Sequence, residues 1–125
     1  MSDKKQAKYG EIWMCNLCSK DESVQHGYRP VFVLSNDMNN TFSPTINVIP
    51  ITSKTSKKSL PIHVYLMNYE KYGLKKPSMM LVEQITTISS TNLDMKIGSI
   101  DDEFTLSRIY NAIGIQFPIV SMFAI

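Results

Sequence analysis

Short apolar runs separated by polar turns dominate this sequence, and they restrict it to a small β-rich fold. The clearest example is the stretch GYRPVFVLSNDMNNTFSP at residues 27–44. Residues 31–34 have the length and β-branched content of a buried strand, and the polar residues 35–40 favour a turn after it. Before the strand, the GYRP segment is expected to form a turn in which Pro30 biases Arg29 toward extended backbone. We therefore expect a rigid strand that holds one arginine at its start.

Further segments have the length and residue types of strands. Residues 61–67 alternate, with Ile62, Val64 and Leu66 on one face. Residues 45–51 contain Pro50, which favours an edge position or a bulge. The strands expected besides residues 31–34 are residues 9–17, 45–51, 61–67, 78–87 and 95–100.

One segment carries the signals of a helix. Asp102 and Glu103 are acidic residues of the type favoured in a first turn, Ser99 or Asp101 is the expected N-cap, and Gly114 is the expected end. Its apolar stripe would consist of Leu106, Ile109, Tyr110 and Ile113. Shorter turns are expected at residues 68–73, where Gly73 is the cap, and at residues 91–93.

These elements predict a mainly β (α+β) fold: a small, strongly bent antiparallel sheet or barrel with a C-terminal helix. The 125 residues suit a single domain, residues 1–125, without disulfides or metals. Within it we expect a flexible basic tail at residues 1–8, a helix at residues 101–114 and an apolar extension at residues 115–125.

Composition excludes several classes of protein. A hydrophobic content of 43% and a charged content of 19% are ordinary for a folded chain and argue against disorder. The apolar runs at both ends are too short for a secretion signal or a membrane span, so we expect a cytoplasmic protein that does not bind membranes. Cys15 and Cys18 lack a second pair that would complete a zinc site, and we interpret them as packing residues. Motifs for metal or cofactor enzymes are absent, so neither a metal nor a cofactor is expected.

Charge is concentrated in one region. Residues 54–76 contain six lysines and a single glutamate, although the whole chain carries a net charge of only +2. Such a region is a candidate for contact with a polyanion, and a solvated lysine-rich loop is the alternative.

Several segments together carry a resemblance to a known family. GEIWMCNL, GYRPVFVLSNDMNNTFSPT, VIPITS, LPIHVYL and SMMLVEQITTI occur in that order between Gly10 and about residue 100. They resemble the MazF/PemK toxins of bacterial type II toxin–antitoxin systems. The resemblance implies an SH3-like barrel with a C-terminal helix, a homodimer, and an antitoxin protein whose tail blocks the RNA groove. It also implies a metal-independent, sequence-selective endoribonuclease that cuts single-stranded RNA, including mRNA.

The resemblance implies catalytic roles for Arg29 of the family's GxRP motif and Thr52 of its IT motif. The RNA 2′-OH would attack the adjacent phosphate and leave a 2′,3′-cyclic phosphate and a 5′-OH, so DNA should not be cut. Arg29 suits transition-state stabilisation, because a guanidinium donates several hydrogen bonds but no proton. Among side chains with a suitable pKa, His26 lies near Arg29 in the sequence and is a candidate proton carrier. A solvated loop histidine is the alternative.

Two sequence departures affect the site. Residues 23–27 read SVQHG, where the family usually has Gly-Gly after an acidic residue, and Thr86 stands where many members have arginine. We expect the loops at residues 18–28 and 53–60 to wall an RNA groove over Arg29 and Thr52. The candidate RNA-binding residues are Ser23, Gln25, Tyr28, Ser53, Lys54, Lys57, Lys58, His63 and Gln84.

Two other functions remain open from the sequence. A toxin of the same fold that resembles CcdB would bind DNA gyrase without cleaving nucleic acid, and it would not need the Arg29 and Thr52 pair. An inactive homologue that only binds RNA or its antitoxin is the other alternative.

Overall fold

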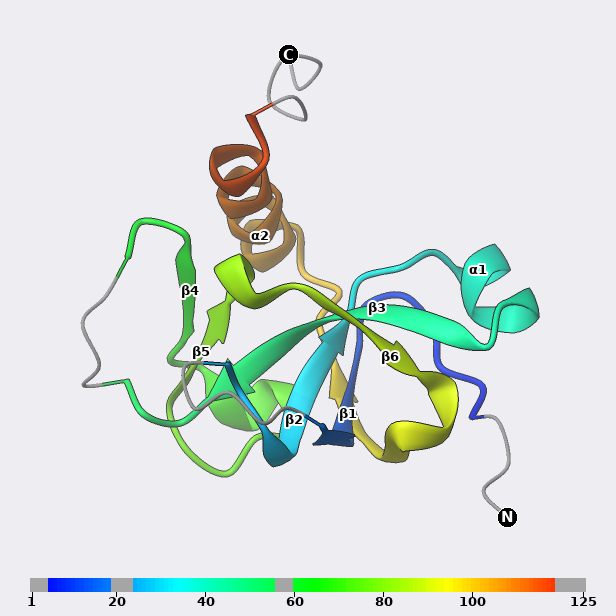
Figure 1. Cartoon of the computed structure of the whole chain (residues 1–125). Helices are drawn as coiled ribbons and strands as arrows, with labels where there is room; N and C mark the ends of the chain where they lie inside the picture. Colours follow the sequence, from blue (N-terminus) through cyan, green and yellow to red (C-terminus); the bar gives the residue numbers. More distant parts are fainter. Residues whose placement is uncertain (1–4, 19–23, 56–59, 119–125) are drawn as a thin grey trace.

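The computed structural model describes residues 5–18, 24–55 and 60–118 of the chain. The elements in this part follow one another as strands, short helices and a final long helix (Figure 1). The strands are β1 (Glu11–Leu17), β2 (Gly27–Val33), β3 (Thr45–Thr52), β4 (His63–Leu66), β5 (Ser78–Leu81), β6 (Thr86–Ser89) and β7 (Leu93–Ser99). The α-helices are α1 (Asp37–Phe42) and α2 (Glu103–Gln116), and the 3-10 helices are η1 (Tyr69–Tyr72), η2 (Val82–Gln84) and η3 (Ser90–Asn92).

The strands form one sheet in the order β4-β5-β3-β2-β1-β7, and β6 also pairs with β3. All of these pairings are antiparallel. Within the described residues, the edge strands β4 and β7 do not pair with each other, so the sheet bends without closing into a barrel. The expectation of an antiparallel sheet with a C-terminal helix is confirmed, and the structure selects a bent open sheet.

Strand β3 changes partner in its second half, and this change explains how the sheet bends. Val48 pairs with Thr86 on β6, whereas Ile51 pairs with Met80 on β5. A shift of three residues along β3 therefore corresponds to a shift of six residues along the segment from β5 to β6. The extra residues of that segment form η2. The continuous strand predicted at residues 78–87 was wrong for this reason. Pro50 lies between the two pairings in a central strand rather than at an edge, so its missing N–H interrupts neither of them.

The two faces of the sheet bury separate apolar clusters. Helix α2 covers one face, where its Ile109 and Ala112 pack with Phe32 and Ile51 from the central strands. The opposite face buries residues such as Val31, and Ala7 from the N-terminal segment packs there at 4% exposure. Ala7 belongs to the segment, residues 1–8, that was expected to be a flexible basic tail, and residues 1–4 of that segment lie outside the described residues.

Helix α2 begins at Glu103 and is capped by Asp102, whose carboxylate accepts a hydrogen bond from the Thr105 backbone N–H at 2.9 Å. It continues through Gly114 to Gln116, so the predicted end was too early. Tyr110 of the expected apolar stripe is 51% exposed. The apolar extension beyond Pro118 lies outside the described residues.

Two local predictions of turns failed, the first because Asn and Asp fit more than one structure. Residues 37–42 form helix α1 rather than a turn, since the side chain of Asn36 caps it by accepting from the Asn39 N–H at 2.8 Å. The GYRP segment is part of β2 and pairs with β1, with Arg29 opposite Cys15.

Cys15 is buried as expected, and burial raises its pKa to about 12. Cys18 is exposed, contrary to the prediction that it packs.

Candidate functional site

A pocket of about 510 Å³ opens beside the first half of β2. Strands β1, β2 and β7 and the segment after η1 surround it. Its lining combines three cationic side chains with a floor of apolar groups, which suits a ligand that carries both phosphates and bases. The lining residues are Met14, Tyr28, Arg29, Pro30, Ser53, Gly73, Leu74, Lys75, Lys76, Ser78, Met95 and Ile97.

Arg29 is the half-buried cation of this pocket. Its Nε donates a hydrogen bond to the His26 backbone oxygen at 3.0 Å. Within the described residues this is the one hydrogen bond recorded for Arg29, and it leaves both terminal NH₂ groups for an anion. A guanidinium fixed at Nε with its two outer nitrogens available matches the geometry of a phosphate.

Arg29 and Thr52 come to facing positions through the register of β2 and β3. The paired residues run from Val33 opposite Val48 to Val31 opposite Pro50. Continuing this register by two residues places Arg29 opposite Thr52, and opposite residues of antiparallel strands project to the same face. The register of β2 on β3 is therefore compatible with the expected pair, and its paired residues end at Val31 and Pro50.

Thr52 is buried at 1% exposure and is the last residue of β3. Its Oγ1 accepts a hydrogen bond from the Lys54 backbone N–H at 3.1 Å. This bond fixes the turn that carries Ser53, which lines the pocket, and Lys54, which is exposed. The Thr52 hydroxyl keeps its own hydrogen for donation, because it uses a lone pair toward Lys54.

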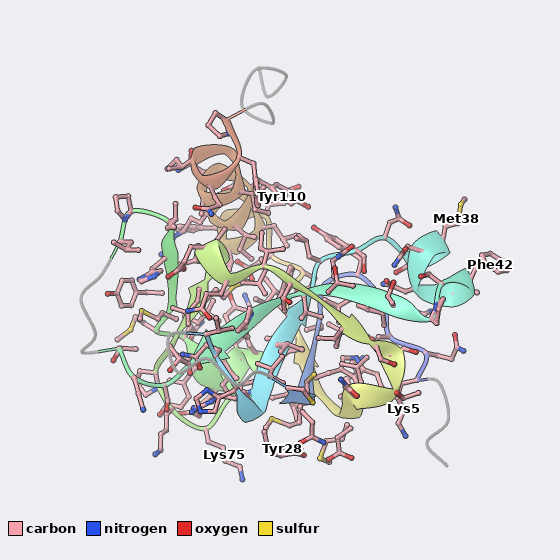
Figure 2. The ribbon with its side chains drawn as sticks, in the orientation of Figure 1. Lys5, Tyr28, Met38, Phe42, Lys75 and Tyr110 are labelled. Atoms are coloured by element: carbon pink, nitrogen blue, oxygen red, sulfur yellow. The ribbon has the colours of Figure 1, made fainter. Side chains whose placement is uncertain are left out.

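Tyr28 lies at the mouth of the pocket, 51% exposed, and its hydroxyl donates to Asp94 Oδ2 at 2.5 Å. The hydrogen bond to this carboxylate raises the pKa of the Tyr28 hydroxyl. Figure 2 shows Tyr28 and Lys75 projecting from the same end of the molecule. An exposed aromatic ring beside lysines is a surface on which a nucleobase can stack.

His26 and Gln25 lie in the loop before β2. The His26 Nδ1 contacts the Val24 carbonyl at 3.0 Å, and because a carbonyl only accepts, Nδ1 carries the proton. The exposed His26 ring therefore presents Nε2 with a free lone pair in its neutral form. The Gln25 backbone N–H donates to Gln84 Oε1 at 2.7 Å. Ser23, Lys57 and Lys58, which were also expected at the site, lie outside the described residues.

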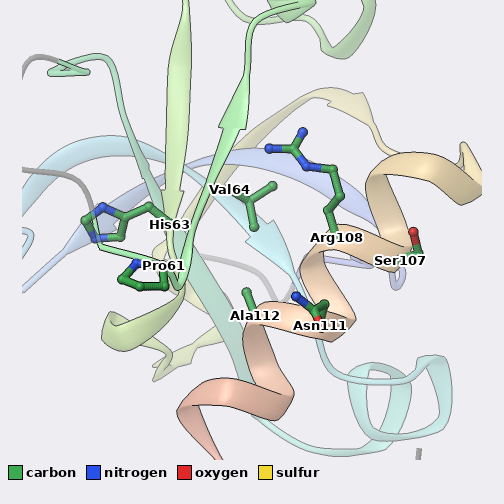
Figure 3. A pocket seen from close by; sticks show the side chains of 7 residues that line it. All are labelled: Pro61, His63, Val64, Ser107, Arg108, Asn111 and Ala112. Atoms are coloured by element: carbon green, nitrogen blue, oxygen red, sulfur yellow. The ribbon is translucent and has the colours of Figure 1, made fainter. Parts of the chain in front are cut away.

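His63 lines a different pocket, of about 360 Å³, between β4 and α2 (Figure 3). Its Nδ1 accepts from the Leu60 N–H at 3.2 Å, so Nε2 carries the proton and donates to Glu83 Oε2 at 2.9 Å. Figure 3 shows the His63 ring and the Val64 side chain leaving β4 in different directions, with Val64 on the side of α2. The structure does not bring His63 into the pocket that contains Arg29.

The sequence interpretation did not assign Lys75 and Lys76 to the site, although it noted the positive charge of their region. Gly73 brings them there. It ends η1 with φ of 80°, and a Cβ at this position would lie 1.8 Å from the Ile97 backbone oxygen. This close approach of η1 to β7 brings the segment of Lys75 and Lys76 to the pocket that Met95 and Ile97 of β7 also line. In the sequence, a glycine suited to the left-handed conformation after a short turn was the available signal for this position. The sequence did not indicate that Gly73 would pack against the strand that contains Ile97.

Comparison with known proteins identifies the family. Residues 8–117 match the family described as PemK-like, MazF-like toxin of type II toxin–antitoxin system. The chain belongs to this family.

Curated members of the family agree with this assignment. The chain is 37% identical over 113 residues to the endoribonuclease EndoA of Bacillus subtilis, covering 90% of this chain and 96% of that protein. It is 36% identical over 107 residues to the endoribonuclease MazF of Staphylococcus saprophyticus, covering 86% of this chain and 88% of the relative.

Solved structures of MazF proteins share the fold of this family member. The Mycobacterium tuberculosis toxin MazF-mt6 superposes with a TM-score of 0.71 at 23% identity, covering 86% of this chain and 96% of that chain. A MazE–MazF structure from Deinococcus radiodurans gives a TM-score of 0.69 at 19% identity, covering 92% of this chain and 98% of that chain. Among the described residues, no helix is long and apolar enough to cross a membrane.

Proposed function

We propose that this chain is a sequence-selective endoribonuclease that cleaves single-stranded RNA, mRNA included, as the toxin of a type II toxin–antitoxin pair. The observation that supports the proposal is the pocket that Arg29 lines together with Lys75, Lys76 and Ser53, the residue that follows Thr52. Relatives that are 36–37% identical bear the name endoribonuclease. Cutting mRNA would stop translation and growth.

The reaction is an attack by the RNA 2′-OH on the adjacent phosphorus. The new P–O2′ bond forms as the P–O5′ bond breaks, which gives a 2′,3′-cyclic phosphate and a 5′-OH end. Arg29 stabilises the negative charge that develops on the phosphoryl oxygens through its two terminal NH₂ groups. Its bond to the His26 carbonyl holds the guanidinium still during the reaction. Because DNA lacks the 2′-OH, it is not a substrate.

His26 is the proposed acceptor of the 2′-OH proton. Its Nδ1–H is held by the Val24 carbonyl, so the proton moves to Nε2, and the departing 5′-oxygen takes a proton from water. Thr52 holds the Ser53 and Lys54 turn in place and directs its remaining O–H toward the phosphate. None of these steps requires a metal or another cofactor.

The rest of the pocket would bind RNA on both sides of the cut. Lys75 and Lys76 line the pocket, and Lys54 is exposed next to Ser53, so all three are proposed contacts for backbone phosphates. Ser53 can donate or accept a hydrogen bond. Tyr28 offers an exposed ring for stacking, and Met14, Met95 and Ile97 form an apolar surface for a base. Sequence selectivity would come from base contacts in this pocket.

The proposed partners are a second copy of the chain and an antitoxin protein. Both come from family membership, and solved structures with the same fold include an endoribonuclease in complex with its cognate antitoxin. An antitoxin tail lying over the Arg29 pocket would cover the cations that bind phosphate and so block cleavage.

The decisive experiment incubates purified protein with single-stranded RNA in EDTA and maps both ends of the products. We expect wild type to leave 2′,3′-cyclic phosphate and 5′-OH ends, and Arg29→Ala to leave the RNA intact. Arg108→Ala is the matched control, because Arg108 is the other arginine of the chain and does not line the pocket. Intact RNA with wild type, or cleavage only after a divalent metal is added, would contradict the proposal.

A further inference from the structure

A hydrogen bond between distant segments connects the turn after β5 to the loop that holds Arg29. The Gln84 side-chain oxygen accepts from the Gln25 backbone N–H at 2.7 Å, across 59 positions of sequence. Gln25 directly precedes His26, and the His26 carbonyl accepts from Arg29 Nε at 3.0 Å. Two hydrogen bonds and the backbone of Gln25 and His26 therefore join Gln84 to the guanidinium.

The turn that carries Gln84 is itself fixed to the sheet. Glu83 accepts a hydrogen bond from His63 on β4 at 2.9 Å, and the His63 side chain is only 4% exposed. On its other side, η2 connects β5 to β6, and both strands pair with β3. Gln84 thus extends from a rigid support.

Residues 24–27, the described part of the chain just before and at the start of β2, are largely exposed. Val24 is 42% exposed, and both His26 and Gly27 are exposed. Within the described residues, the buried side-chain oxygen of Gln25 has no hydrogen-bond partner. The backbone contact to Gln84 is therefore a major constraint on where the His26 carbonyl lies.

We propose that Gln84 is a positioning residue that aims Arg29, rather than a residue that contacts RNA. The inference rests on the proposed ribonuclease function and adds a role to that site. The Gln84 carbonyl oxygen is already engaged by Gln25, and Gln84 does not line the pocket that contains Arg29. Holding the loop lets the His26 carbonyl keep the guanidinium in one orientation, which transition-state stabilisation requires.

Two variants of similar size separate the hydrogen bond from packing. Gln84→Met keeps the length of the side chain and removes the acceptor, whereas Gln84→Glu keeps an acceptor oxygen. Thr87→Val is the matched control: it removes the hydrogen bond from Asn47 Nδ2 to Thr87 Oγ1 at 2.8 Å, on β6 and away from the loop.

The first measurement is amide hydrogen exchange of Gln25 by NMR, without RNA. We expect exchange at least about tenfold faster in Gln84→Met than in wild type, because the N–H loses its acceptor. Gln84→Glu and Thr87→Val should keep the wild-type rate. An unchanged rate in Gln84→Met would overturn the proposal.

The second measurement is RNA cleavage at saturating and subsaturating RNA. We expect Gln84→Met to lower kcat by about tenfold to 100-fold, with KM nearly unchanged and the cleavage positions the same. Gln84→Glu should recover most of kcat. A raised KM or altered cleavage positions would instead identify Gln84 as an RNA contact and contradict the positioning role. Wild type that cuts no RNA would refute the proposed function, while the exchange rates would still decide whether Gln84 holds the loop.

Discussion

Arg29 lies opposite Thr52 when the register of β2 on β3 is continued past Val31 and Pro50. The two residues therefore project from neighbouring strands to the same face of the sheet. Arg29 lines the pocket, whereas Thr52 is buried beside it and bonds to the Lys54 N–H. In the function proposed above, Arg29 contacts the phosphate, whereas Thr52 supports the turn beside the pocket and donates its hydroxyl hydrogen toward the phosphate.

The hydroxyl of Thr52 should matter more than its shape. Thr52→Val keeps the volume but removes the acceptor for Lys54 N–H, so we expect a stability loss of about 1 kcal/mol. Cleavage should fall by at least about tenfold, because the turn at Ser53 loses its support and the phosphate loses a donor. Thr52→Ser should retain most activity. RNA cleavage rates and thermal unfolding of the three proteins check this, and wild-type rates in Thr52→Val would refute a role for the hydroxyl.

Lys75 and Lys76 should contribute to RNA binding through phosphate contacts. Binding of a 2′-O-methyl RNA, which cannot react, should weaken in the double variant Lys75→Gln, Lys76→Gln. The slope of log affinity against log salt should shrink by about 1.4 if each lysine contacts one phosphate of a single strand. Lys5→Gln, Lys8→Gln removes the same charge outside the pocket and should leave the slope nearly unchanged. Equal slopes for both double variants would mean that the pocket lysines act only through net charge.

Gly73 should be essential for folding. It has φ of 80°, and an added Cβ would lie 1.8 Å from a backbone oxygen that cannot move away easily. We expect Gly73→Ala to lower the free energy of unfolding by more than about 2 kcal/mol. Gly27→Ala is the control, because Gly27 has φ of 85° but nothing within 4 Å of the added Cβ. Urea unfolding of both variants separates the close contact from backbone strain, and equal losses would show that the contact with Ile97 is unimportant.

Asp102 should make the folding stability of the protein depend on pH in the acid range. The hydrogen bond from Thr105, supported by Tyr72 and Lys71, holds the pKa of this carboxyl well below its usual range. Because the folded pKa is depressed, the stabilisation is present above the unfolded value of about 4 and is lost as pH falls below it. Asp102→Asn should therefore cost stability at neutral pH, and the difference from wild type should narrow toward about pH 2. Thermal unfolding of wild type and Asp102→Asn across this pH range measures the stability difference. A stability difference that does not change with pH would contradict the depressed pKa of Asp102.

The sequence alone determined the strand-rich class, most strand positions and the C-terminal helix. The alternation at Ile62, Val64 and Leu66 was confirmed, as was the turn ended by Gly73. These features follow from local periodicity and from backbone preferences, which act over a few residues. The motifs that carry the family resemblance are equally local, and the comparisons confirm the family.

Only the tertiary structure decided what the strands bring together. Local preferences did not determine that β3 changes partner at Pro50 or that Asn36 caps a helix, because Pro, Asn and Asp each fit several structures. The position of Lys75 and Lys76 beside Arg29 depends on how Gly73 packs against Ile97. The contact between Gln84 and Gln25 joins segments that are far apart in the chain. Such pairings arise from sheet register and packing across the whole domain, which the residues of one segment do not specify.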